Sequence, residues 1–125
     1  MPVTSPMTTP IPSDELWPEA LDALIAAPEH HELLLEDDRV RVVRTHVPPG
    51  ERTAVHTHRW SGVLTVVTWS QFVRRDAEGN VLVDSRLNPA MHPTGKVMWA
   101  GALPPHTFEN VGDTEFNVIT VELKD

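Results

Sequence analysis

From residue 31 onward the chain alternates short apolar runs with turn signals, a pattern that predicts β-strands. Breaks such as 48–50 (Pro-Pro-Gly) and 76–80 (Asp-Ala-Glu-Gly-Asn) separate the runs. Seven or more strands at intervals of roughly 8–12 residues indicate an all-β sandwich or barrel. No strand–helix alternation follows residue 30, which argues against a parallel α/β sheet. The expected strands cover 33–35, 40–47, 63–67 with a continuation toward 73, 81–83, 97–99, 107–111 and 116–123.

The first 30 residues follow a different pattern. Residues 1–12 are rich in proline and threonine, which is typical of a flexible arm. Leu21, Leu24 and Ile25 then form an apolar stripe at helical spacing, so we expect a short helix over residues 14–27. This helix should pack on the outside of the β-structure. The remainder is one domain over 13–125, with its barrel at about 31–124.

The composition excludes several classes of function. The chain has 125 residues, a formal net charge of −8 and no cysteine. The length suits one domain with one core, and the charge argues against nucleic acid and anionic membranes as partners. Disulfides, thiolate metal ligands and a cysteine nucleophile are excluded. No apolar run is long enough to span a bilayer, and the first residues lack the pattern of a signal peptide, so we expect a cytoplasmic protein.

Two histidines one residue apart, His56 and His58, are the strongest chemical signal in the chain. Alternate residues of a strand share a face, so both imidazoles would point the same way. A third imidazole from a later strand, His106, would complete a facial set of nitrogen ligands. Such a set suits a borderline divalent ion such as Fe, Mn, Ni, Cu or Zn.

The spacing around these histidines resembles the first motif of the cupins. That motif is a glycine, five residues, His-x-His and, after three or four residues, a glutamate. Gly50, His56 and His58 match it. The glutamate would fall at 62 or 63, where the chain has Gly62 and Val63. The carboxylate ligand is therefore missing.

The second cupin motif is also present in part. Gly95, His106 and Asn110 occupy matching positions, whereas Gly101 and Leu103 replace the motif's proline and second glycine. The resemblance spans roughly residues 32–123 and implies a double-stranded β-helix, a small jelly-roll barrel with its site inside the mouth. Cupin barrels commonly pair, so it also implies a homodimer.

The resemblance implies that His56, His58 and His106 are the metal ligands. Without the carboxylate they form a neutral three-histidine set, similar to that of some cupin dioxygenases, cysteine dioxygenase among them. Iron(II) is the favoured ion, with Zn, Ni, Mn or Cu as alternatives. The extra net positive charge on such an ion favours a small anionic or enolisable substrate. The expected function is thus that of a metal-dependent oxygenase.

Two alternatives stay open. Many cupins bind a small molecule without metal and without catalysis, and the missing glutamate fits that class. An isomerase or epimerase with a histidine acid–base pair ranks last, because the sequence shows no carboxylate partner for a histidine.

Residues around the motif complete the expected site. Val63, Thr65 and Val67 share a strand face and are expected to form an apolar pocket wall, with Trp99 lining the cavity from a neighbouring strand. Other polar residues are expected to be solvated, among them His30, His31 and the pair Arg74 and Arg75.

Overall fold

The chain folds into two antiparallel β-sheets that share one interior. The computed structural model describes residues 17–88, 91 and 96–124. Its elements are η1 (Glu19–Leu21), α2 (Ala23–Ala26), β1 (His31–Glu36), β2 (Val40–Val47), β3 (His56–His58), β4 (Gly62–Thr68), β5 (Phe72–Asp76), β6 (Val81–Asp84), β7 (Val97–Ala100), β8 (Leu103–Asn110) and β9 (Phe116–Leu123). The all-β architecture expected from the sequence is confirmed.

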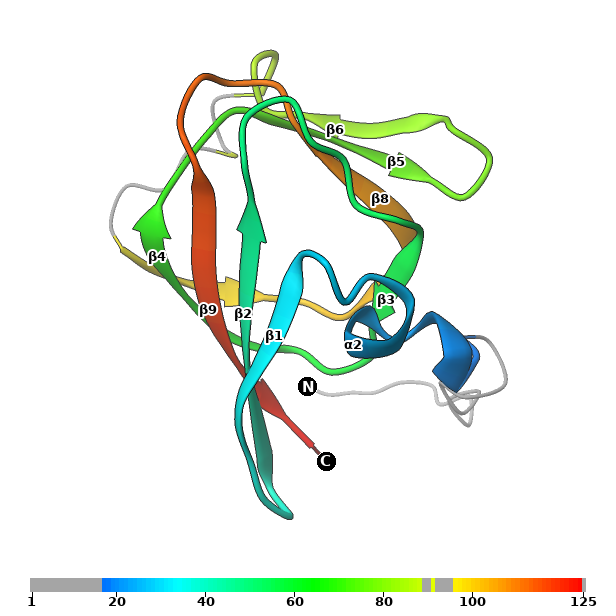
Figure 1. Cartoon of the computed structure of the whole chain (residues 1–125), viewed down its shortest axis with the longest axis vertical. Helices are drawn as coiled ribbons and strands as arrows, with labels where there is room; N and C mark the ends of the chain where they lie inside the picture. The colour runs from blue at the N-terminus through cyan, green and yellow to red at the C-terminus, as the bar shows by residue number, and fades with distance from the viewer. Residues whose placement is uncertain (1–16, 89–90, 92–95, 125) are drawn as a thin grey trace, which may run out of the picture.

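The two sheets have a jelly-roll arrangement. One sheet has five strands in the order β1-β2-β9-β4-β7, and the other has four in the order β3-β8-β5-β6. Strands β2 and β9 pair along their whole length, from Val40 opposite Leu123 to Val47 opposite Phe116. In Figure 1, β9 lies between β2 and β4, while β8, β5 and β6 form the opposing wall.

An apolar core fills one end of the interior. Phe72 and Phe108 stack with ring centroids 4.8 Å apart, and Phe108 lies 4.4 Å from Phe116. Val47 and Val118 complete the buried cluster. These residues come from both sheets and from alternate strand positions, as a strand with one buried face requires. The core therefore closes the space between the sheets.

Asn110, the last residue of the second cupin-like motif, has a structural role. Its side chain is fully buried and its amide nitrogen donates to the carbonyl oxygens of Val47 and Thr114, both at 2.8 Å. Its amide oxygen accepts from the Ser70 hydroxyl at 2.7 Å and from the Gly112 backbone N–H at 2.9 Å. Asn110 thus fastens the loops at the apolar end of the barrel.

The prediction of a continuous helix over 14–27 is wrong for residues 17–27, the part of it that the structure describes. The segment is a 3₁₀ turn followed by a single α-helical turn, because Asp22 between them is extended (φ −54°, ψ 141°). Asp22 caps α2 by accepting from the Leu24 backbone N–H and is ion-paired with Arg41. Asp22 also forms an isolated parallel β-bridge with Thr57 of β3. Tertiary contacts have overridden the local helical pattern, and α2 lies against β1 and β3 (Figure 1).

Some expectations lie outside the described residues. These are the flexible arm at 1–12, the beginning of the expected helix and Gly95 of the second motif. No helix in the described part of the chain is long and apolar enough to cross a membrane.

Candidate metal centre

A cavity of about 320 Å³ extends through the barrel interior from the apolar core to a cluster of histidines. Four imidazoles line it, contributed by β1, β3 and β8. Leucine, methionine, phenylalanine and tryptophan side chains form most of the remaining wall, and the lining has two charged residues. The imidazoles are His31, His56, His58 and His106, and the charged residues are Arg74 and Glu122.

His56 and His58 project into the cavity from β3, as the alternation predicts. Their Nε2 atoms are 3.2 Å apart. The Nδ1 of His56 is 2.8 Å from the Ala54 carbonyl oxygen, so it carries the proton and leaves the Nε2 lone pair free. Two nitrogens bound to one ion at about 2.1 Å lie roughly 3.0 Å apart at a right angle and about 3.4 Å apart at a tetrahedral angle. The observed separation fits a shared ion.

His106 joins this pair from the neighbouring strand. It lies directly opposite His56 in the β3–β8 ladder, with ring centroids 4.4 Å apart. Its Nδ1 donates to the Pro104 carbonyl oxygen at 2.7 Å, which again leaves Nε2 free. The fold therefore brings the three histidines of the sequence motif together.

His31 is a fourth imidazole that the sequence analysis missed. It was expected to be solvated, but its residue is only 5% exposed. Its ring centroid lies 4.5 Å from that of His56 and 5.3 Å from that of His58. Its Nδ1 is bound to the Ala27 carbonyl oxygen at 2.9 Å, and its buried Nε2 has no hydrogen-bond partner. The candidate ligand atoms of His31, His56 and His58 all lie within 4.8 Å of one another.

The four imidazoles are neutral near pH 7. Burial, reinforced by the neighbouring histidines, lowers the pKa of His31 and of His106 to about 2. The same causes lower the pKa of His58 to about 3, and burial lowers the pKa of His56. A neutral imidazole offers the lone pair that a metal ion needs. The cluster can therefore hold a metal ion without first losing protons.

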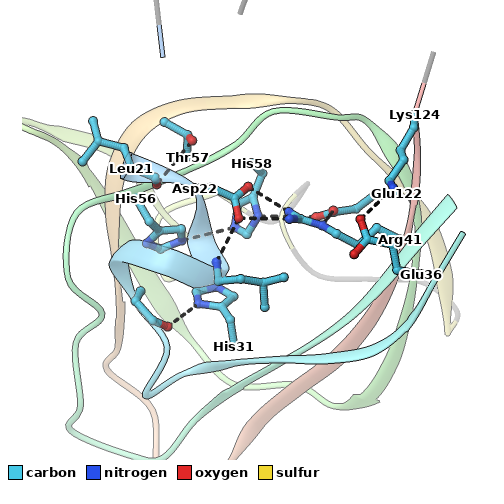
Figure 2. Close-up of polar contacts among 12 residues, drawn as sticks. Leu21, Asp22, His31, Glu36, Arg41, His56, Thr57, His58, Glu122 and Lys124 are labelled. Atoms are coloured by element: carbon cyan, nitrogen blue, oxygen red, sulfur yellow. Dashed lines mark hydrogen bonds and ion pairs between the residues drawn. The ribbon is translucent and has the colours of Figure 1, made fainter. Parts of the chain in front are cut away.

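A buried carboxylate stands beside this cluster. Glu122, on β9, is 1% exposed, and its Oε2 lies 3.9 Å from the Nδ1 of His58. Its Oε1 accepts a 2.7 Å hydrogen bond from the Nε of Arg41. Arg41 in turn donates from both terminal nitrogens to Asp22, at 3.0 and 2.9 Å. Figure 2 shows Asp22, Arg41 and Glu122 in a row next to His58.

This row connects three separate parts of the chain. Burial acts to lower the pKa of Arg41, but the hydrogen bonds and charges of Asp22 and Glu122 outweigh it, so the net shift is upward. Burial raises the pKa of Glu122, and Arg41 opposes that shift. The Oε2 of Glu122 is too far from His58 for a hydrogen bond. It can still favour a proton on the Nδ1 of His58, which directs the Nε2 lone pair toward His56.

Comparison with solved structures defines the fold. No family model matches the sequence, and no curated protein matches it. A cupin domain from Bordetella pertussis superposes with a TM-score of 0.56 at 23% identity, covering 76% of this chain and 92% of that one. The chain has the cupin fold. The expected double-stranded β-helix is thereby confirmed.

Two further structures agree with this assignment. An uncharacterised protein with a double-stranded β-helix domain from Klebsiella pneumoniae superposes with a TM-score of 0.50 at 22% identity, covering 74% of each chain. A cupin family protein from Methanocaldococcus jannaschii does so with a TM-score of 0.50 at 12% identity, covering 74% of this chain and 77% of that one. These similarities establish the cupin fold. They do not identify the chemistry of the site, which depends on the residues of this chain.

In cupin terms, the structure locates the missing carboxylate. Of the two positions expected for the motif glutamate, Gly62 is buried and Val63 faces outward, so Gly62 occupies the inward position. Glu122 lies directly opposite Gly62 in the β4–β9 ladder. Paired residues of adjacent strands point to the same side. The chain therefore has a carboxylate near its histidines, but β9 contributes it and Arg41 binds it.

The expected pocket wall is wrong by one residue. Val63, Thr65 and Val67 lie on the outer face of β4, with Val63 36% and Val67 52% exposed, and none of them lines the cavity. Leu64 lines it instead. A shift of one residue exchanges the two faces of a strand, and the expectation counted from 63 rather than 62. Trp99 does line the cavity, at its rim, and is 61% exposed.

Proposed function

We propose that this cupin binds a divalent metal ion through the Nε2 atoms of His56, His58 and His106, with His31 as a fourth nitrogen. The observation that carries the proposal is the arrangement of the rings. Three of them, His31, His56 and His106, have Nδ1 bound to a backbone carbonyl, which leaves Nε2 free in the buried space that they share with His58. Hydrogen bonds to the far ring nitrogen are the usual way in which proteins orient metal-binding histidines.

The spacing of the rings supports a shared ion. Imidazoles bound to one ion at right angles, with bonds of about 2.1 Å, have ring centroids roughly 4.5–5 Å apart. The centroids of His56 lie 4.5 Å from His31, 4.8 Å from His58 and 4.4 Å from His106. Four nitrogens would leave two positions of an octahedral ion for a substrate or another small molecule.

The proposed reaction class is oxygenation of a small anionic or enolisable substrate, with iron(II) as the favoured ion and Zn, Ni, Mn or Cu as alternatives. A redox-active ion at this site would supply electrons and open coordination positions for a substrate and dioxygen together. The residues of the chain supply the rest. The imidazoles are neutral ligands, so the ion would keep its full positive charge. Glu122 would orient His58. The apolar wall around Leu64 and Met98 would exclude bulk water from the reacting groups.

Metal analysis tests the proposal directly. The full chain is stripped with a chelator, loaded with iron(II) without oxygen, desalted and analysed for metal. We expect close to one equivalent in the wild type and loss of the ion in His56→Ala and His58→Ala. His46→Ala is the matched control, because His46 pairs with Glu115 on the surface. Less than about a tenth of an equivalent after loading would contradict a functional site.

Variants of the two flanking histidines define the ligand set. His106→Ala and His31→Ala should each lower metal affinity, because the centroids of both rings lie close to that of His56, at 4.4 and 4.5 Å. The absorption spectrum of a cobalt(II) derivative would show each change in ligand number. An unchanged spectrum in His31→Ala would remove His31 from the set. Dioxygen uptake with small carboxylic and enolisable compounds then tests the oxygenase class.

A metal-free binding protein is the second candidate. It is supported by the cavity of about 320 Å³, whose wall is largely apolar and of a size that suits a small molecule. This candidate predicts that organic ligands raise the melting temperature and that divalent ions do not. A rise of several degrees with iron(II) or cobalt(II), abolished in His56→Ala, would count against it.

Isomerase chemistry stays a lesser prediction. Glu122 gives His58 the carboxylate neighbour that the sequence did not show, but Arg41 already engages that carboxylate. Solvent deuterium entering a candidate substrate without dioxygen uptake would support this class.

A further inference from the structure

Arg74 was expected to be solvated, but its side chain lines the cavity. It follows Phe72 by two residues on β5, so both side chains point inward, and both line the cavity. The next residue, Arg75, faces the other way, and its Nη1 donates a 2.6 Å hydrogen bond to Glu109. Two adjacent arginines therefore have opposite environments.

The guanidinium of Arg74 has no ion-pair partner among the described residues. Its Nε is buried without a hydrogen bond. The guanidinium carbon lies 5.7 Å from the centre of the Phe72 ring. The other charged residue of the cavity, Glu122, is bound to Arg41. Burial lowers the pKa of Arg74, which reflects the cost of leaving this charge without a partner.

A second unpaired donor lines the same cavity. The indole Nε1 of Trp69 is also buried without a hydrogen-bond partner. An indole N–H and a guanidinium N–H can only donate. Buried donors normally have acceptors, so these two groups indicate a ligand that is rich in acceptors.

Arg74 is also close to the histidines. Both line the same cavity of about 320 Å³. One small molecule of the cavity's size can therefore lie between the guanidinium and the imidazole cluster.

We propose that Arg74 binds the carboxylate of a small-molecule ligand whose apolar body packs against the aromatic and methionine side chains of the cavity. The planar fork of a guanidinium matches a carboxylate with two parallel hydrogen bonds. The ligand would be a monocarboxylic acid with a short alkyl or aryl body, since the wall contains Phe72, Phe108, Met91 and Met98. This deepens the proposed function by naming its substrate class, yet the binding of the carboxylate itself does not require a metal ion.

The test uses the full chain after removal of metal with a chelator, so that no ion can serve as the anion receptor. Acetate, propionate, benzoate and phenylacetate are titrated against the protein, each beside its primary amide. Binding is followed by calorimetry and by the fluorescence of the tryptophans that line the cavity. We expect at least one acid to bind about tenfold or more tightly than its amide, which is neutral but has nearly the same shape.

Variants assign the effect to the residue. Arg74→Met keeps the aliphatic stem and should weaken binding of that acid about tenfold or more, while its amide is unaffected. Arg75→Met, on the outer face, is the matched control and should change binding less than about twofold. Arg74→Lys keeps the charge without the fork and should give an intermediate affinity, which provides a second reading if Arg74→Met does not fold.

Either of two results would overturn the proposal: no acid binds more tightly than its amide, or both Arg74 variants bind the acid as the wild type does. Metal loading is measured separately on the same proteins. Arg74→Met that loads iron(II) normally but loses acid binding separates this inference from the metal site. A wild type that binds the acid yet takes up no metal would refute the metal site alone.

Discussion

The two ends of the barrel interior are built by the same strands, but one is wholly apolar and the other carries the histidines and charged side chains. On β5, inward Phe72 is followed two residues later by inward Arg74. On β8, inward His106 precedes Phe108, and β9 runs from Phe116 at the apolar end to Glu122 beside the histidines. The position of a residue along its strand therefore determines the end of the barrel at which its side chain lies. The alternation of strand residues between the two faces determines only whether the side chain points inward.

The ends also differ in what they contribute to stability. The phenylalanine end removes apolar surface from water, which favours folding. The other end buries Asp22, Arg41 and Glu122, whose side chains are 4%, 8% and 2% exposed. Desolvation of such charges is offset only by good hydrogen-bond geometry. The comparison indicates that the phenylalanine end contributes more to folding stability than the end with the buried charges.

Acid should affect the histidine end most strongly. In metal-free protein the pKa values of His31 and His106 are near 2 and that of His58 is near 3, against 6.5 when unfolded. Between pH 6.5 and about 3 these histidines are protonated in the unfolded chain but not in the folded protein. The free energy of unfolding therefore falls as the pH drops below 6.5. Each group contributes up to about 1.4 kcal/mol per pH unit.

Urea titrations of metal-free protein at pH 7.5 and 5.0 would measure this effect. Because the pKa of Glu122 is raised in the folded protein, protonation of Glu122 increases the free energy of unfolding as the pH falls. The opposite effect of the three histidines should be larger. An equal free energy of unfolding at the two pH values would show that the histidines are not held neutral by burial.

Arg41→Met should be nearly as severe. It leaves Asp22 and Glu122 buried without their partner, and breaking a buried pair typically costs about 3–5 kcal/mol. Neutralising both acids in the same background, with Asp22→Asn and Glu122→Gln, should restore much of the loss in a chemical unfolding experiment. If Arg41→Met alone is neutral, the row of charges is not a coupled unit.

Phe116→Ala addresses the phenylalanine core, which borders the cavity. Removing a buried phenylalanine that packs on Phe108 and Phe72 should cost about 3–5 kcal/mol. The metal content after loading should stay unchanged in the protein that remains folded. Val67→Ala, on the outer face of β4, should change stability by less than about 0.5 kcal/mol. Loss of metal in Phe116→Ala would show that the two ends are not independent.

Glu122→Gln should have a selective effect on the site and a smaller effect on stability than Arg41→Met. It keeps the shape of the side chain and removes the charge that favours the proton on the Nδ1 of His58. Changes in such supporting groups typically lower metal affinity about 10–100-fold. Glu115→Gln, at the surface pair with His46, is the control. Equal metal affinity in the two variants would exclude a positioning role for Glu122.

Local patterns in the sequence were sufficient to predict the β-architecture. The alternation within 40–47 and 116–123 marked β2 and β9, and turn residues marked the hairpin at 76–80, where Gly79 has a φ of +91°. The His-x-His spacing also placed His56 and His58 on one face. Their meeting with His106 followed from the resemblance and agrees with the β3–β8 pairing.

The remaining site residues depend on non-local pairing. His31 enters the cavity because β1 pairs with β2, where it lies opposite the cavity-lining Thr45. Glu122 lies near the histidines because β9 pairs with β4, where Glu122 is opposite Gly62. In the sequence, only its charge near the end of the apolar 116–123 run distinguishes Glu122. No spacing within the first motif could reveal either residue.

The close approach of β4 and β9 has an evolutionary consequence. A β-carbon placed on Gly62 would lie 1.9 Å from the carbonyl oxygen of Val121, so any larger residue there requires the neighbouring strand to move. A glutamate at position 62, where the cupin motif would have it, could therefore not arise by one substitution alone. It would also need a change in the backbone of β9.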